Sequence, residues 1–173
     1  SVHFLSLLDA GAWEEALAQR QSDLVILGYG TNESGYWGIP GPRYEREYGE
    51  IIARVKRALP HASILIMAPM DRGMRDESGA IVTMPKIPEI VEAQRKVARE
   101  NGCAFFDTFA AVGGPGTMAR WYDAEPRLVT GDFTHTTKTG SDRVARLLVE
   151  ALEAGYVGGR PAPAPTPVPV AAS

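Results

Sequence analysis

Asp132 and His135 are the side chains of this sequence whose types and spacing most directly suggest chemistry. They lie in the segment Thr130–Gly140, which carries a glycine near each end. A carboxylate that accepts a hydrogen bond from one imidazole nitrogen orients the ring, so that the other nitrogen can take a proton from a nucleophile. The pair would therefore supply the acid and the base of a nucleophilic hydrolase, and its nucleophile has to come from elsewhere.

Asn32 is the second polar side chain in a suggestive place, because it follows the apolar run Leu24–Leu27 in the segment Gly30-Thr31-Asn32-Glu33. Ligands of parallel sheets bind beyond the carboxyl ends of the strands. An amide placed there can donate to the oxygen that becomes negative when an ester carbonyl is attacked.

Each of these residues alone also has an ordinary structural interpretation. Asn32 could bond its own turn, Asp132 could be a turn or capping carboxylate, and His135 could be a hydrogen-bonded loop histidine. The joint pattern of Gly-x-Asn after a strand and Asp-x-x-His before a helix is more specific than either half.

Three apolar runs predict the strands that would position these side chains, and we expect the first to be covered on both faces. Their residues are 24–27, 63–67 and 103–106. Apolar spacing of three and four predicts helices at 44–59, 88–101 and 144–155, with a short one around Trp13. Residues 70–84 and 109–127 show no clean period and are predicted to be loops. Alternating strands and helices indicate an α/β fold with a parallel sheet and right-handed crossovers.

Composition narrows the function. The chain has 173 residues and a net charge of -3, with a pI near 5.6 and no basic stripe, so nucleic acid is not an expected partner. No apolar run approaches the roughly 20 residues that cross a bilayer, and the N-terminus lacks the regions of a signal peptide. The only cysteine, Cys103, excludes an internal disulfide.

Two units are predicted: a domain over residues 1–157 and a Pro/Ala-rich linker or tail over residues 158–173. Because the chain begins with Ser1 and not with Met, we expect it to be processed or to be a piece of a longer protein.

The two motifs carry a family resemblance. Gly30-Thr31-Asn32-Glu33 and Asp132-Phe133-Thr134-His135 resemble the third and fifth sequence blocks of the SGNH (GDSL-type) hydrolases, which are esterases and lipases. The resemblance implies a three-layer α/β/α, flavodoxin-like parallel sheet. It also implies that His135 is the general base, that Asp132 orients it, that Asn32 is an oxyanion-hole donor, and that Gly30 shapes the hole.

The stretch Gly113-Gly114-Pro115-Gly116 followed by Trp121 is similar to members that remove acetyl groups from sugars, including peptidoglycan O-acetylesterases. This similarity implies an acylated carbohydrate or small ester as substrate, no cofactor, and an extracytoplasmic location, periplasmic or secreted. Trp121 and Tyr122 could contact the sugar, although aromatic residues in a long loop also pin that loop to the core.

The Gly-Asp-Ser nucleophile block of that family and its second, glycine-containing block are both missing from this chain. The sheet is therefore expected to lack its first strand, and an upstream domain or another chain would supply the serine. Alone, the chain should be a poor esterase.

Other readings of the sequence stay open. Ser34 or Cys103 could be a nucleophile, and Asp132 with His135 could bind a metal, although no close ligand spacing supports a metal site. The main alternative function is a non-catalytic carbohydrate-binding module on the same fold. An unrelated α/β fold is the remaining possibility.

Overall fold

A parallel sheet of three strands forms the centre of the computed structural model, which describes residues 1–36 and 38–158. The strands are β1 (Leu24–Leu27), β2 (Ser63–Met67) and β5 (Ala104–Phe106), in the order β1-β2-β5. Leu24 pairs with Ser63, and Leu65 pairs with Ala104. The sequence predicted all three strands, and the α/β fold with a parallel sheet is confirmed.

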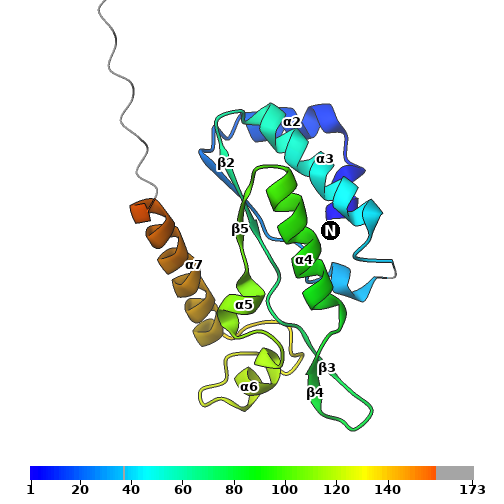
Figure 1. Ribbon diagram of the computed structural model, residues 1–173, viewed down its shortest axis with the longest axis vertical. Helices are drawn as coiled ribbons and strands as arrows, with labels where there is room; N and C mark the ends of the chain where they lie inside the picture. Colours follow the sequence, from blue (N-terminus) through cyan, green and yellow to red (C-terminus); the bar gives the residue numbers. More distant parts are fainter. Residues whose placement is uncertain (37, 159–173) are drawn as a thin grey trace, which may run out of the picture.

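Two long helices cover one face of this sheet (Figure 1). They are α3 (Pro42–Ala58) and α4 (Lys86–Glu100), close to the predicted bounds. Two N-terminal helices, α1 (Val2–Ser6) and α2 (Ala10–Ala18), pack against α3. The resulting core joins apolar side chains of α3, α4, β1 and β2, with residues Tyr48, Ile51, Ile52, Val55, Leu27, Ile64, Ile66, Ile90 and Val97 among its members.

The last helix, α7 (Lys138–Gly158), stands on the opposite side of the sheet (Figure 1). Helix α7 ends at Gly158, beyond the predicted end near Gly155. The first part of α7 contacts α5 (Thr108–Val112). Val144 and Leu147 pack against a second core cluster that includes Trp121 and Phe133.

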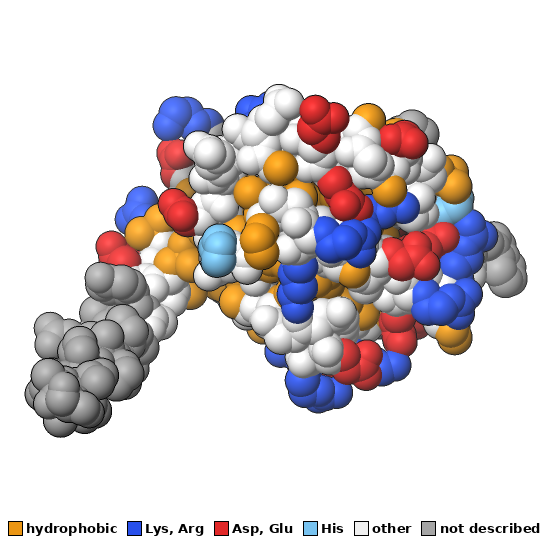
Figure 2. All heavy atoms as spheres, turned by 90° about the horizontal axis from the view of Figure 1, so that it is seen from above, with side chains coloured by type: hydrophobic (Ala, Val, Ile, Leu, Met, Phe, Trp, Pro, Cys, Tyr) orange, Lys and Arg blue, Asp and Glu red, His pale blue; other side chains and the backbone are white. Residues whose placement is uncertain are grey.

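The prediction that β1 is covered on both faces is wrong for the described residues. Neighbouring side chains of a strand point to opposite faces, and Leu27 packs in the core whereas Leu24 and Ile26 are 43% and 45% exposed. Helix α7 lies on that side of the sheet, and two of its apolar side chains, Val149 and Leu152, are exposed as well. Figure 2 views the molecule from above, and hydrophobic side chains are visible where the described part of α7 meets the rest of the molecule.

The two segments predicted to be loops contain regular structure. Residues 70–84 include an antiparallel hairpin of β3 (Gly73–Arg75) and β4 (Ile81–Thr83). Residues 109–127 include most of α5 and all of α6 (Thr117–Asp123). Helix α5 begins at an N-cap, where the Asp107 carboxylate accepts a hydrogen bond from the Ala110 N–H at 2.8 Å. These elements are too short to show a hydrophobic period, which is why the pattern missed them.

No helix among residues 1–36 and 38–158 is long and apolar enough to span a membrane. Apart from its first residue, the predicted Pro/Ala-rich tail lies outside the described residues.

Candidate active site

Asp132 and His135 are hydrogen-bonded to each other. The Nδ1 atom of His135 lies 2.5 Å from Oδ2 of Asp132, and the two side chains are 79% and 52% exposed. The other carboxylate oxygen, Oδ1, accepts from the Thr130 hydroxyl at 2.7 Å, and from the backbone N–H groups of Thr134 at 2.9 Å and His135 at 3.0 Å. The carboxylate is thus held by donors on both oxygens, and it orients the imidazole.

These hydrogen bonds also determine the charge of Asp132. The His135 side chain contributes most, followed by the His135 backbone and Thr130, and together they hold the pKa of the Asp132 carboxyl well below its ordinary value. Hydrogen bonds to the ionised form favour that form. Asp132 is therefore a carboxylate at neutral pH, as a group that orients a general base has to be.

A buried aromatic residue anchors this exposed loop. Phe133 has a positive φ of 55°, is 8% exposed, and meets the ring of Tyr122 edge-on at 5.0 Å between centroids. Its carbonyl oxygen accepts a hydrogen bond from the Gly73 N–H at 2.8 Å. A Cβ atom on Gly73 would lie 2.7 Å from that of Phe133, so only glycine permits this approach. The β3–β4 hairpin and α6 thus hold the loop through Phe133, while the side chains of Asp132 and His135 remain exposed to solvent.

Asn32 is exposed and precedes the short 3-10 helix η1 (Glu33–Gly35). Its side chain makes no capping hydrogen bond, so the structure does not support the reading of Asn32 as a residue that bonds its own turn. The amide remains able to donate to a ligand.

Gly30 and Glu33 build the turn that carries Asn32. Gly30 has a φ of 123°, and a Cβ atom there would lie 2.9 Å from both the Gln94 side chain and the Ile90 side chain. Glu33 is 2% exposed, and its carboxylate accepts from the Gly30 N–H at 3.1 Å and from the Val2 N–H at 2.8 Å. The Gly30 N–H is therefore occupied, and this residue shapes the turn. The role of Glu33 could not be predicted from the sequence, because no spacing pattern indicates a buried carboxylate.

The two loops open on one hollow. Thr31 and Thr136, the neighbours of Asn32 and His135, both line a cavity of about 420 Å³ at the carboxyl ends of β1 and β2. Thr108 lines the same cavity, is 1% exposed, and has a hydroxyl without a hydrogen-bond partner among the described residues. The sheet edge thus brings the residues next to Asn32 and His135 to one cavity, whereas the side chains of Asn32 and His135 are not among its lining residues.

The alternative nucleophiles are engaged elsewhere. Ser34 is 2% exposed and donates to the Thr31 carbonyl at 2.7 Å, as a turn serine does. Ser141, a serine that lines the cavity beside Thr136, is hydrogen-bonded to the Thr136 hydroxyl at 2.7 Å. Burial raises the pKa of the half-buried Cys103 thiol, which disfavours its nucleophilic thiolate form. None of Ser34, Ser141 and Cys103 is hydrogen-bonded to His135.

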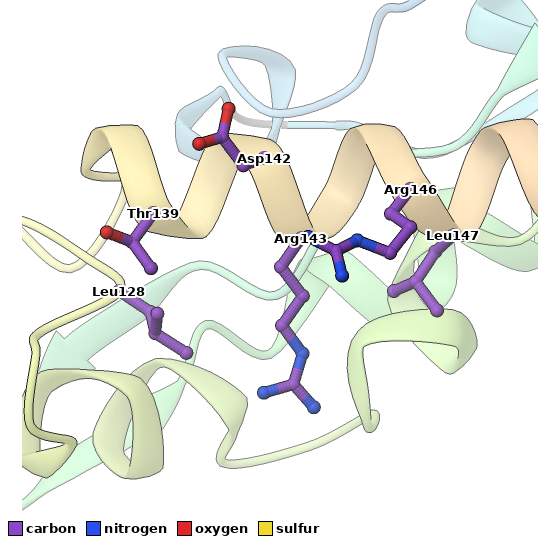
Figure 3. Close-up of a pocket in the computed structure, with 6 residues that line it drawn as sticks. All are labelled: Leu128, Thr139, Asp142, Arg143, Arg146 and Leu147. Carbon is purple, nitrogen blue, oxygen red and sulfur yellow. The ribbon is translucent and has the colours of Figure 1, made fainter.

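Trp121 and Tyr122 both pack in the second core cluster. Trp121 is 4% exposed and Arg143 of α7 lies over its ring at 5.7 Å, while Arg127 lies over the Tyr122 ring at 4.2 Å. Figure 3 shows Arg143 reaching from α7 toward the side of α5 and α6, beside Leu128 and Leu147. Their predicted contact with a sugar stays a prediction, and it would require Trp121 to be uncovered.

The part of the chain that the structure describes contains no group of three or more His, Cys, Asp or Glu residues able to hold a metal ion. The geometry at His135 is that of a ring oriented by a single carboxylate, which suits a general base.

Solved structures with this architecture include two acetyl esterases and a domain of an acetyltransferase. A peptidoglycan O-acetylesterase is 28% identical, with a TM-score of 0.76 over 88% of this chain and 45% of its own. An acetylxylan esterase from Geobacillus stearothermophilus is 18% identical, with a TM-score of 0.59 over 87% of this chain and 66% of its own. The periplasmic domain of a lipopolysaccharide acetyltransferase from Salmonella ser. Paratyphi A is 14% identical, with a TM-score of 0.55 over 83% of this chain and 61% of its own.

The last two similarities show the fold alone, because their sequence identities are low. The chain spans less than half of the peptidoglycan O-acetylesterase and just under two thirds of the acetylxylan esterase. None of the curated proteins matches this chain in sequence.

The sequence profile of the GDSL-like lipase/acylhydrolase family matches residues 5–143, which include both motifs and the whole sheet. This match covers most of the chain and agrees with the fold, with the SGNH-type motifs and with the acetylesterase neighbours. The chain therefore belongs to the GDSL-like lipase/acylhydrolase family of ester hydrolases.

Proposed function

We propose that this chain contributes the base, its orienting acid and an oxyanion donor to an SGNH-type ester hydrolase that removes acetyl groups from a carbohydrate. The serine nucleophile of the triad lies outside this chain, supplied by an upstream segment or a partner. The observation that carries the proposal is the hydrogen bond from His135 Nδ1 to Asp132 at 2.5 Å, with the imidazole 79% exposed. That arrangement leaves Nε2 facing solvent, where a serine hydroxyl could reach it.

The reaction would proceed through an acyl-enzyme. The serine oxygen attacks the ester carbonyl carbon while His135 Nε2 takes the serine proton, and Asn32 donates to the carbonyl oxygen as it becomes negative. His135 then gives its proton to the leaving sugar oxygen, and the C–O bond breaks. Water, deprotonated by His135, attacks the acyl group and releases acetate and free serine. Asp132 stays ionised throughout and stabilises the imidazolium.

The substrate class and location are supported by the similar structures. One of them is a peptidoglycan O-acetylesterase and another an acetylxylan esterase, so an O-acetylated polysaccharide is the substrate we assign. Peptidoglycan lies outside the cytoplasm, which supports an extracytoplasmic, periplasmic or secreted, location for the reaction. Neither a cofactor nor a nucleic acid enters this mechanism.

A chimera would test the roles of the proposed residues. The segment of the peptidoglycan O-acetylesterase that precedes the aligned region would be fused before Ser1, and acetate release from O-acetylated peptidoglycan and acetylated xylo-oligosaccharides would be measured. We expect hydrolysis that falls by at least about a thousandfold in His135→Ala, and by about a hundred- to a thousandfold in Asn32→Ala.

The chain without the fusion is the matched control, and it should release no more acetate than its His135→Ala variant. A folded, active chimera whose rate is unchanged by His135→Ala would refute the assignment of the base. Turnover by the chain alone that depends on His135 would show that the nucleophile lies within it. A chimera that folds and binds saccharide but never hydrolyses would favour the non-catalytic binding module.

A further inference from the structure

Residues 71–73 connect the two loops of the candidate site. They lead from β2 into β3, beyond the carboxyl end of β2, where ligands of parallel sheets bind. The side chain of Arg72 contacts the turn that carries Asn32. The backbone of Gly73 contacts the loop that carries His135. Both contacts join segments that are far apart in the sequence, and neither motif contains them.

The Arg72 side chain bonds the turn at two points from a single nitrogen. Its Nη1 atom donates to the Thr31 carbonyl oxygen at 2.9 Å and to the Ser34 hydroxyl oxygen at 3.0 Å. The Ser34 hydroxyl donates to the same Thr31 carbonyl at 2.7 Å. Asn32 lies between Thr31 and Ser34 in the chain, so these hydrogen bonds hold the turn on both sides of it. A charged donor makes them roughly twice as strong as neutral hydrogen bonds.

The turn is the partner that holds the guanidinium of Arg72. The side chain is half-buried, and no salt bridge among residues 1–36 and 38–158 includes it. Burial removes part of the hydration of a charged group, and hydrogen bonds have to replace that hydration. Arg95, by contrast, forms ion pairs with Glu92 and Asp107. The charge of Arg72 is therefore directed at the turn and not at a carboxylate.

The backbone from which Arg72 extends is itself fixed. The Arg72 carbonyl oxygen accepts a hydrogen bond from the Met84 N–H at 2.7 Å. The carboxylate of Asp71 is 2% exposed and accepts from the Met118 N–H of α6 at 3.0 Å. Arg72 thus reaches the turn from a segment that is bonded to the β4 side of the hairpin and to α6.

The same segment supports the loop of the acid–base pair. The Gly73 N–H donates to the carbonyl of Phe133, the residue that follows Asp132, at 2.8 Å. Consecutive Cα atoms are about 3.8 Å apart, so neighbouring residues of one rigid segment hold both loops. Loss of the Arg72 side chain would release the turn of Asn32 and leave the support of Phe133 in place.

We propose that Arg72 is a positioning residue for the proposed reaction, and that it holds the Asn32 amide in place relative to His135. It acts through Asn32 and does not contact the substrate. An oxyanion donor has to lie about 3 Å from the oxygen that becomes negative, and a misplacement of about 1 Å can cost roughly a hundredfold in rate. The inference deepens the proposed function and rests on it for the role of Asn32.

Amide hydrogen exchange of the chain itself tests the positioning without catalysis. Arg72→Met keeps an apolar stem without a donor, whereas Arg72→Lys keeps a charged nitrogen that can make both bonds. We expect the amides of Ser34 and Gly35, which bond within the turn, to exchange at least about tenfold faster in Arg72→Met and within about threefold of the parent in Arg72→Lys. Arg75→Met is the matched control, because Arg75 bonds the Gly79 carbonyl of the same hairpin and not the turn.

The core amides of α3 serve as the internal reference for this exchange. Unchanged exchange at Ser34 and Gly35 in Arg72→Met would overturn the inference. An equal rise in Arg75→Met, or a rise shared by the amides of α3, would overturn it too, because the effect would then be a general loosening of the hairpin or of the fold.

A double-mutant cycle in the chimera tests whether Arg72 acts through Asn32. Arg72→Met should lower kcat about ten- to a hundredfold and change KM less than about threefold, and Arg72→Lys should restore most of kcat. Added to Asn32→Ala, Arg72→Met should slow hydrolysis by less than about twofold further, because the donor that it positions is already gone.

Effects of the two substitutions that multiply would mean that Arg72 contacts the substrate through its other N–H groups, and would overturn the positioning role. A folded chimera without hydrolysis would count against the proposed function, and the exchange measurement alone would then decide on Arg72. Failure of the inference and failure of the proposed function therefore give different results.

Discussion

The turn around Asn32 is held by a buried carboxylate, whereas the loop around His135 is held mainly by hydrogen bonds to Asp132 within its own segment and by the buried ring of Phe133. In the first, the buried carboxylate of Glu33 joins two N–H groups, and Gly30 fits tightly among side chains of the core. In the second, Asp132 collects hydrogen bonds from residues within three positions of itself, and Phe133 is the anchor. The proposed oxyanion donor, Asn32, therefore depends on distant packing against α1 and α4, whereas the proposed acid–base pair depends mainly on a short local segment.

Because of this difference, the residues that stabilise the fold are not the residues proposed to carry out catalysis. Substitutions in the buried supports should lower the free energy of unfolding, and substitutions of the exposed polar groups should change it little. The expected loss in the free energy of unfolding is therefore largest at the buried glycines and carboxylate and smallest at the exposed side chains.

Gly140→Ala should be the most destabilising change, because a Cβ atom at this position would lie 1.9 Å from the Leu128 carbonyl oxygen, a backbone atom. The beginning of α7 would have to move away from the loop of His135. We expect a loss of about 3 kcal/mol or more in the free energy of unfolding measured with urea. Gly155→Ala in the same helix is the control and should be neutral or slightly stabilising, because among the described residues nothing outside its own stretch of helix lies within 4 Å of a Cβ atom there. Equal urea midpoints for the two variants would contradict the prediction.

Glu33→Ala should remove the internal support of the Asn32 turn. It leaves the N–H groups of Val2 and Gly30 without their acceptor, at a cost of about 1–3 kcal/mol for a buried group. We expect the unfolding free energy to fall by about 2–3 kcal/mol, while Glu50→Ala on the exposed side of α3 changes it by less than about 0.5 kcal/mol. A Glu33→Ala variant as stable as Glu50→Ala would show that the turn does not need the buried carboxylate.

Asp132→Asn should cost less than about 1 kcal/mol at pH 7, because the carboxylate is exposed to solvent. The folded state lowers the pKa of Asp132, so its contribution is fully present above the unfolded value of about 3.9. It is lost as the pH falls from there toward the lowered pKa. Denaturation of wild type and variant at pH 7, 4 and 2.5 should therefore show a difference that shrinks with acid, and a difference that grows would reverse the sign we assign.

His135→Ala and Asn32→Ala should change stability least, within about 0.5 kcal/mol, because both side chains are exposed. The same substitutions should have the greatest effect on hydrolysis in the chimera. Thermal unfolding and acetate release measured on the same samples provide the check. A marked loss of stability in either variant would mean that the residue supports the fold, and that its effect on activity cannot be read as chemistry.

The sequence was informative where a pattern is local. The apolar runs 24–27 and 63–67 became strands, the periodic segments became α3, α4 and α7, and Asp132 and His135 met because three residues of loop suffice to join them. The interpretation of Asn32 also depended on its place directly after a strand, and the structure puts it there.

The sequence was uninformative where contacts join distant segments. Glu33 meets Val2 across 31 positions, and His3 meets Glu47 across 44, so no spacing rule reveals either. The run Leu24–Leu27 is apolar at every position, and such a run does not say which face stays open. The hairpin strands have three residues each, too few for alternation to be recognised. Asp107 before α5 was a visible capping signal that could have predicted that helix.

The unpaired edge and the uncovered face of β1 also affect the solubility of the purified chain. β1 is paired with β2 alone among the described strands, and Leu24 and Ile26 lie bare on its uncovered face. An unpaired edge with an apolar face is a template on which a second molecule can add its own strand. Aggregation would then begin with the association of two copies of the chain. Its rate would therefore depend more on protein concentration than on temperature.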